Sequence, residues 1–414
     1  MQTRPRLYPP AGDRVAISYQ AGPLREISSC VFTPSATTSQ LRLGTSHISR
    51  TTLRDMATDE PPTQEGSAAA GTSVIPDPVS GVVPGQHWLQ TAQNIPQDDD
   101  RDSALGDDDN DTSTASITSS ILHYRTIQGR TYHSERGNAK YWGSNDEAQN
   151  ESMDINHHSL LLALDNKLYL APLSKDIQKV IDIGTGTGIW AIDFADEFPN
   201  TEVIGTDISP IQPSWVPPNL KFEIEDCTQQ WTFPSDSFDF VHIRWLNGSI
   251  DDWAKLFREA YRCCKPGGYL ESFEGAPYLE SDDGTVKDTE ALGQWGKLFV
   301  EAGRRFGRSF TTVPDGIQRK AIEEAGFVEV DEKNIKTPIG GWPKDSLLKS
   351  IGRYAQIALT EDVEGYVLLM AKEVGWTEQE TLLYAAQVRR EIRSGKHHAY
   401  YRQKIVWGRK PEAS

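Results

Sequence analysis

The sequence predicts an α/β fold in which a mostly parallel, Rossmann-like sheet carries helices on both faces. From residue 121 to about residue 412, short apolar runs alternate with segments of helical period, which is the pattern of parallel strands joined by helices. A glycine-rich turn also follows the first apolar run directly, as expected where a strand passes into a helix. We therefore expect one folded domain over residues 121–412.

The first 120 residues have a different composition. They are rich in Ser, Thr, Pro, Gly and Asp and show no sustained period of 2 or 3.6. Such a segment buries too little apolar surface to offset the entropy lost on ordering. The acidic run at residues 98–111 is typical of a solvated spacer. We predict a long disordered tail over residues 1–120.

The first part of the domain contains the clearest strands and helices. A helix is expected over residues 189–198, where Pro199 ends it. A second helix begins at Trp253, carries an apolar stripe, and ends at the Lys265-Pro-Gly-Gly turn. The expected strands are residues 180–183, 201–207, 220–224, 238–243 and 269–274.

The second part of the domain is predicted to add a helix at residues 315–325 and strands at 327–335 and 399–407. Residues 343–394 lie between these two strands and are mostly helical in pattern. Thr377 and Glu380 have the spacing of a capping box. We expect this helical insertion before the last strand to cover one end of the sheet as a cap.

Charge and cysteine content exclude several classes of protein. The 42 Lys and Arg against 59 Asp and Glu give a net charge of −17, which disfavours direct binding of nucleic acid. Four cysteines in 414 residues do not form a disulfide framework. No run approaches the roughly 18 apolar residues of a membrane span. We expect a soluble intracellular protein, in the nucleus or the cytoplasm.

The strongest local signal is the turn Asp182-Ile-Gly-Thr-Gly-Thr-Gly188. Gly184, Gly186 and Gly188 allow a sharp turn and a close approach of the backbone to a ligand. A dinucleotide and S-adenosylmethionine both use such a turn, and Gly186, Gly188 and Ala191 satisfy the dinucleotide pattern. Asp182 would repel a pyrophosphate but can meet the ammonium of S-adenosylmethionine, directly or through water. This carboxylate favours the sulfonium ligand.

Acidic residues follow the next two predicted strands. Asp207 ends the second strand, where a carboxylate can accept both ribose hydroxyls of an adenosyl group. Asp226 follows the third strand and can accept from an adenine amino group, or it can simply form a turn. We include Asp226 and its neighbour Cys227 among the expected cofactor-binding residues.

The sequence does not identify a catalytic base. Methyl transfer needs mainly alignment of the reacting atoms. His133, His157, His158 and Glu274 are possible bases for a hydroxyl acceptor, but we expect each to have a structural role. No metal-ligand cluster is present: the adjacent pairs His157-His158 and His397-His398 would point about 100° apart on a helix. The aromatic residues Tyr141, Trp142 and Trp245 are expected in the core or in an acceptor pocket.

Taken in order, these motifs resemble those of class I S-adenosylmethionine-dependent methyltransferases. The segments 141–146 (Tyr-Trp-Gly-Ser-Asn-Asp) and 154–158 (Asp-Ile-Asn-His-His), together with Ala171-Pro172, resemble the fungal LaeA-like methyltransferases more narrowly. The resemblance spans residues 124 to 411. It implies a seven-stranded sheet with a reversed final hairpin and S-adenosylmethionine at the carboxyl ends of the first strands.

The resemblance leaves the role of the protein open. It implies either methylation of a fungal metabolite or regulation of secondary metabolism beside velvet-type partner proteins. A methyltransferase-fold regulator that acts mainly through protein partners is therefore the main alternative to an enzyme. A nicotinamide-dependent oxidoreductase is a weaker one, because it leaves Asp182 and Asp226 unexplained.

Overall fold

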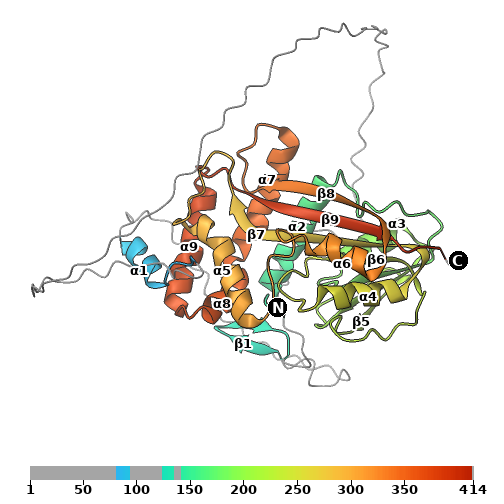
Figure 1. The fold of residues 1–414 in the computed structure, drawn as a ribbon. Helices are drawn as coiled ribbons and strands as arrows, with labels where there is room; N and C mark the ends of the chain where they lie inside the picture. Colours follow the sequence, from blue (N-terminus) through green and yellow to red (C-terminus); the bar gives the residue numbers. More distant parts are fainter. Residues whose placement is uncertain (1–80, 94–123, 135–140, 413–414) are drawn as a thin grey trace, which may run out of the picture. The chain divides into compact units, whose positions relative to one another are not determined.

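The computed structural model describes residues 81–93, 124–134 and 141–412 (Figure 1). A seven-stranded sheet with the order β5-β4-β3-β6-β7-β9-β8 forms its centre. The strands of this sheet are β3 Lys179–Ile183, β4 Glu202–Asp207, β5 Leu220–Ile224, β6 Phe238–Arg244, β7 Cys264–Glu280, β8 Val328–Pro338 and β9 Tyr400–Arg409. The predicted seven-stranded fold is confirmed.

One strand of the sheet, β9, runs opposite to the other six. The neighbouring pairs from β5 to β7 are parallel, whereas β9 runs antiparallel to both β7 and β8. The strand β7 is much longer than expected and continues past the end of β6 while still paired with β9. Its register against β9 shifts between Gly275 and Leu279.

Helices cover both faces of the sheet because alternate residues of the central strands point to opposite sides. In β3, Val180 packs in the cluster around α3 (Ile189–Glu197), whereas Ile181 packs with α4 (Trp253–Cys263) and α6 (Ile317–Ala325). All four residues from Val180 to Ile183 are buried. The central strands are therefore mostly apolar on both faces.

Further helices form a layer at one end of the sheet, away from α3, α4 and α6 (Figure 1). They form an apolar core of their own with the far end of β7 and β9. Thr377 and Glu380 make the predicted capping box. These helices are α5 Ala291–Phe306, α7 Ser346–Glu361, α8 Val363–Glu373 and α9 Glu378–Arg393. The helix α2 Glu147–Ala163 contacts both α7 and α3. Among the described helices, none combines the length and hydropathy needed to cross a membrane.

The structure differs from the predicted tail at residues 81–93. Here α1 (Gln86–Gln93) packs against α9, and Trp88 is only 2% exposed, in ring contact with Trp376 and Tyr384. The backbone N–H of Val83 donates to Gln294 Oε1 at 2.8 Å. The prediction was wrong for this segment because its partners lie hundreds of residues away and its apolar residues are too few to show a period. The rest of residues 1–120 lies outside the described part.

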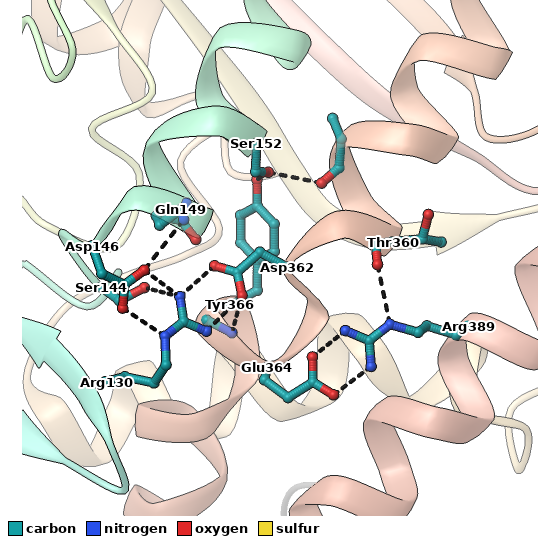
Figure 2. A network of polar contacts seen from close by, with 12 residues as sticks. Arg130, Ser144, Asp146, Gln149, Ser152, Thr360, Asp362, Glu364, Tyr366 and Arg389 are labelled. Carbon is teal, nitrogen blue, oxygen red and sulfur yellow. Dashed lines mark hydrogen bonds and ion pairs between the residues drawn. The ribbon is translucent and has the colours of Figure 1, made fainter. Parts of the chain in front are cut away.

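An arginine joins three segments of the helical layer (Figure 2). Arg130 lies on the hairpin of β1 (Arg125–Ile127) and β2 (Arg130–Tyr132). Its guanidinium is 2.6 Å from Asp146 Oδ2 and 2.6 Å from Asp362 Oδ1. Asp146 caps the N-terminus of α2 and Asp362 caps that of α8. One half-buried cation therefore fixes the hairpin against the starts of two helices.

Candidate functional site

A cavity of about 260 Å³ opens at the carboxyl ends of β3, β4 and β6, the usual ligand position in sheets of this type. Its two ends differ in chemistry. The glycine half is lined by the turn after β3 and by the acids after β4 and β5, including Asp182, Thr185, Gly186, Asp207 and Asp226. The aromatic half is lined by Tyr141, Trp142, Trp245, Trp295, Phe299, Phe310, Tyr366 and Tyr401.

The glycine turn has the backbone geometry that the sequence predicts. Gly184, Gly186 and Gly188 have φ of 67°, 59° and 80°, in the region that favours glycine. A Cβ on Gly188 would lie 2.3 Å from the Phe222 ring, so this residue also allows α3 to pack closely on the sheet. Gly184 and Gly186 line the cavity, whereas Gly188 lies behind it as the N-cap of α3.

Asp182 is buried at the end of β3 and both of its carboxylate oxygens have partners. Oδ1 is 2.7 Å from His242 Nδ1, and Oδ2 accepts from Thr185 Oγ1 at 2.6 Å. The His242 ring stacks on Trp190 with 3.6 Å between centroids. Burial lowers the pKa of His242, which favours the neutral ring with Nδ1–H donating to Asp182. Protein groups therefore orient this carboxylate at the cavity wall.

Asp207 connects the end of β4 to the glycine turn. Its carboxylate accepts from the backbone N–H of Gly186 and of Ser209, each at 2.9 Å. Burial raises the pKa of Asp207 to about 6, and the two backbone donors oppose the rise. This carboxylate lines the cavity directly beside the turn.

Asp226 and Cys227 line the same half from the loop after β5. Asp226 Oδ1 accepts from Thr228 N at 2.9 Å and from Thr228 Oγ1 at 2.7 Å, so this residue does form the turn that its sequence context allows. Burial raises the pKa of the Cys227 thiol, which keeps it protonated. Of the seven residues expected at a cofactor site, the structure places six in one cavity wall and Gly188 behind it.

Sequence reasoning missed a buried charged group beside these residues. Arg244 ends β6, lines the cavity, and donates to His157 Nδ1 at 3.0 Å, while His157 Nε2 lies 3.1 Å from Asp193. Burial lowers the pKa of both His157 and Arg244. Asp154, one helical turn before His157 on α2, accepts from Thr187 in the glycine turn at 2.6 Å. The spacing of Asp154 and His157 was visible in the sequence, but Arg244 at the end of an apolar strand gave no signal.

The other residues considered as bases lie outside the cavity lining. His133 Nε2 accepts from the backbone N–H of Tyr141 at 3.0 Å, and His158 packs against Tyr354 at 4.4 Å between centroids. Glu274 accepts from the backbone N–H groups of Leu246 and Asn247, and burial raises its pKa to about 8. These three residues support the structure.

The aromatic half contains all three aromatic residues singled out from the sequence. Trp142 donates from Nε1 to Asn247 O at 2.9 Å and contacts the rings of Phe299 and Phe310. Trp245 has φ of 60°, which is unusual for a bulky side chain and typical of functional sites. Tyr141, Trp142 and Trp245 therefore pack against neighbouring side chains and also line the cavity.

A sheet of this order, with a glycine turn after its first parallel strand and acids after the next two, defines a class I S-adenosylmethionine-dependent methyltransferase. The methyltransferase domain family matches residues 155–328. The methyltransferase pytC of Aspergillus terreus is 35% identical over 305 residues, covering 73% of this chain and 93% of that protein. The secondary metabolism regulator LAE1 of Cochliobolus heterostrophus is 34% identical over 291 residues, covering 69% and 94%.

The chain therefore belongs to the LaeA-like methyltransferases, and its cofactor is S-adenosylmethionine. This assignment sets aside the nicotinamide-dependent alternative. Among solved structures, phosphoethanolamine N-methyltransferase 2 of Haemonchus contortus in complex with S-adenosyl-L-methionine is similar with a TM-score of 0.38 and 17% identity, covering 64% of this chain and 53% of that one.

Proposed function

We propose that this protein methylates a small molecule of fungal secondary metabolism, which binds in the aromatic half while the cofactor binds in the glycine half. One observation carries the proposal: a single cavity is lined at one end by the turn and acids expected for S-adenosylmethionine and at the other by aromatic rings. Concave, mostly apolar cavities with a few polar groups are typical of small-molecule sites.

The residues of the glycine half fit the parts of the cofactor. Asp207 would accept from the ribose hydroxyls, and Asp226 and Cys227 would lie beside the adenine. The turn at Gly184 and Gly186 would approach the methionine portion, whose ammonium would meet Asp182 directly or through water. Arg244 supplies a buried cation on this wall and would attract the methionine carboxylate.

The cofactor supplies an activated methyl group, so the protein has to align the acceptor and exclude water. The titratable side chains of the aromatic half suit positioning better than proton removal. Burial raises the pKa of Tyr141, Tyr366 and Tyr401, which therefore stay protonated at neutral pH. His157 is already held between Arg244 and Asp193. We propose alignment, without a dedicated base, as the contribution of these residues.

The helical insertion at residues 343–394 is part of this proposal. Ala355, Ala358 and Leu359 of α7 and Tyr366 of α8 line the cavity. We infer that the insertion acts as a cap that selects the acceptor. Substitution of the lining residue Leu359 by Trp, which leaves the helices in place, should preserve cofactor affinity and reduce product formation.

A second function, regulation through protein partners of the velvet type in the nucleus or the cytoplasm, has support of its own. Several relatives are named secondary metabolism regulators. In addition, α7 exposes the large apolar side chains Leu347, Leu348, Tyr354 and Ile357. Exposed apolar residues gathered on one helix favour contact with a partner.

Two measurements test the proposal. Isothermal titration calorimetry with S-adenosylhomocysteine should show micromolar binding, whereas NAD should give no heat of binding. Incubation with isotopically methyl-labelled S-adenosylmethionine and fungal metabolite extracts should then give a labelled small molecule, detected by mass spectrometry. Label found only on co-purified protein, with none on any small molecule, would support the regulatory alternative.

A further inference from the structure

Arg244 is a buried cation that forms no ion pair with any carboxylate in the described part of the chain. It is the last residue of β6, and it lines the cavity with part of its surface accessible. Burial lowers the pKa of its guanidinium, because a charge is less stable away from water. Arginine stays charged even so, and a buried charge without a partner is costly. This position therefore favours an anionic ligand.

The acids around Arg244 stabilise its charge without occupying its donors. Three carboxylates attract the guanidinium, those of Asp154, Asp182 and Asp193. Each of them already accepts a hydrogen bond from a side chain of the glycine turn or of α2. The guanidinium carries several N–H donors in one plane, and only the contact with His157 uses one of them among the described residues.

The strand register places Arg244 on the cofactor side of the cavity. The strand β6 runs parallel to β3, with Ile243 beside Ile183. The next residues, Arg244 and Gly184, therefore leave the two strands side by side, and both line the cavity. Because Gly184 belongs to the glycine turn, the anion expected here is part of the cofactor. The anionic group of S-adenosylmethionine is its carboxylate.

His157 fixes one side of the guanidinium, and Asp193 fixes His157. Arg244 Nη1 donates to His157 Nδ1 at 3.0 Å, so Nδ1 carries no proton, because an arginine can only donate. The neutral ring then has its proton on Nε2, which donates to Asp193 Oδ2 at 3.1 Å. His157 is 3% exposed, and burial lowers its pKa, in agreement with a neutral ring. Every donor in the chain from Arg244 to Asp193 therefore meets an acceptor.

The three residues of this chain come from three elements around the glycine turn. Arg244 ends β6, His157 lies on α2, and Asp193 lies on α3, the helix that follows the turn. One helical turn before His157, Asp154 accepts from Thr187 of the turn itself at 2.6 Å. The helix α2 is thus held at two points, one on the turn and one on α3. The place of the guanidinium is therefore fixed relative to the turn.

We propose that His157 and Asp193 are positioning residues, which hold the guanidinium of Arg244 where it binds the carboxylate of S-adenosylmethionine. This inference rests on the proposed function, because it requires the cofactor to occupy the glycine half. The chain of hydrogen bonds ends in a cation whose remaining donors have no described partner. The cofactor carboxylate is the acceptor that completes it, through charge-assisted hydrogen bonds.

Calorimetry on the full chain with two ligands tests the inference. One ligand is S-adenosylhomocysteine, and the other is its decarboxylated analogue, in which a hydrogen replaces the carboxylate. The two share the adenosyl group, the sulfur and the amine, so general damage to the site weakens both equally. We expect the unaltered protein to prefer S-adenosylhomocysteine about tenfold, the effect of a hydrogen bond to a charged group.

Variants then assign this preference to residues. Arg244→Gln should remove it, so that the two ligands bind within about twofold of each other. His157→Phe and Asp193→Ala should each lower the preference to about threefold, because the guanidinium then loses one side of its support. Asp193 is partly exposed, so Asp193→Ala tests the inference even if His157→Phe does not fold.

Matched controls lie beside the two positioning residues. His158→Phe changes the next residue of α2, which packs against Tyr354 outside the cavity lining. Asp196→Ala changes an exposed acid of α3. Both controls should keep the full preference of the unaltered protein.

The outcomes separate this inference from the proposed function. Equal affinity for the two ligands in the unaltered protein would overturn the inference and leave a cofactor site in place. A full preference that persists in either His157→Phe or Asp193→Ala would also overturn it, because Arg244 would then keep its position without that residue. If neither ligand binds the unaltered protein, the cofactor site itself is wrong, and the proposed function falls together with the inference.

Discussion

The two halves of the cavity are built in different ways. The glycine half takes Asp182, Gly186, Asp207 and Asp226 from one short stretch of chain, and each lies at or just after the carboxyl end of a parallel strand of the same sheet. The aromatic half draws on segments that are far apart in sequence, from Asn145 to Tyr401. Local turns are sufficient to shape the first half, whereas the second depends on the packing of the whole helical layer. This division is expected if the glycine half binds a cofactor common to many methyltransferases and the aromatic half binds an acceptor specific to this protein.

The largest expected effect is the loss of cofactor binding in the glycine half. Gly186→Val places a branched side chain at φ of 59° where the ligand would lie, and binding of S-adenosylhomocysteine should be lost in calorimetry. Gly307→Ala is the control, because it has a similar φ of 75° with open space around it. The melting temperature of Gly186→Val should stay close to that of the control, which would show that the variant is folded. If the folded variant still binds S-adenosylhomocysteine, the turn is not the cofactor site.

The next effect concerns the helices that support the aromatic half. Arg130→Ala leaves Asp146 and the buried Asp362 without their shared cation, at a cost of about 3 to 5 kcal/mol in the free energy of unfolding. Urea denaturation measures this loss, and hydrogen exchange should rise first in α2 and α8. Arg402→Ala removes an exposed ion pair with Glu280 and should cost less than about 1 kcal/mol. Equal losses in the two variants would show that Arg130 does not hold the starts of α2 and α8 together.

Trp88→Ala tests whether α1 belongs to the helical layer. Removal of this buried ring should lower the free energy of unfolding by about 3 kcal/mol. Trp215→Ala, at a site that is 75% exposed, should change stability by less than about 0.5 kcal/mol. Chemical denaturation of both variants measures the difference. A small effect at Trp88 would mean that residues 81–93 contribute nothing to the core.

The smallest expected effect tests the contribution of one carboxylate of the glycine half to cofactor binding. Asp207→Asn should weaken S-adenosylhomocysteine binding by about 1.5 to 3 kcal/mol, as for hydrogen bonds to a charged group. In the free protein the pKa of Asp207 is raised from 3.8 to about 6. The folded state then binds the proton more tightly, so this group makes stability fall as pH rises from about 4 to about 6.

Thermal melts across that pH range check the sign. Asp207→Asn should remove this contribution to the slope, while Asp226→Asn should leave it in place. A slope that persists unchanged in Asp207→Asn would assign the proton to another group.

The sequence predicted the parts of the structure that depend on local chemistry. Strands β3 to β6, the glycine turn and the capping box at Thr377 all have short-range causes: apolar runs, positive φ and a side chain that caps its own helix. The C-terminal strands and the insertion were also located, although β7 is far longer than expected, because its last residues pair only with the distant β9.

The features that sequence reasoning missed depend on distant partners. Trp88 is buried only because Trp376 and Tyr384 receive it. Arg244 becomes a buried charge at the cavity only because β6 ends beside α2. None of these relations produces a pattern along the chain.

The long strand β7 has a consequence for motion. Together with β9 it runs without interruption from the sheet into the helical layer, so the two halves of the cavity share a pair of hydrogen-bonded strands rather than a flexible linker. A hinge between them would have to break that ladder, except where the register shifts between Gly275 and Leu279. Opening and closing of the site is therefore confined to bending of the strands at this irregularity and to local movements of α7 and α8.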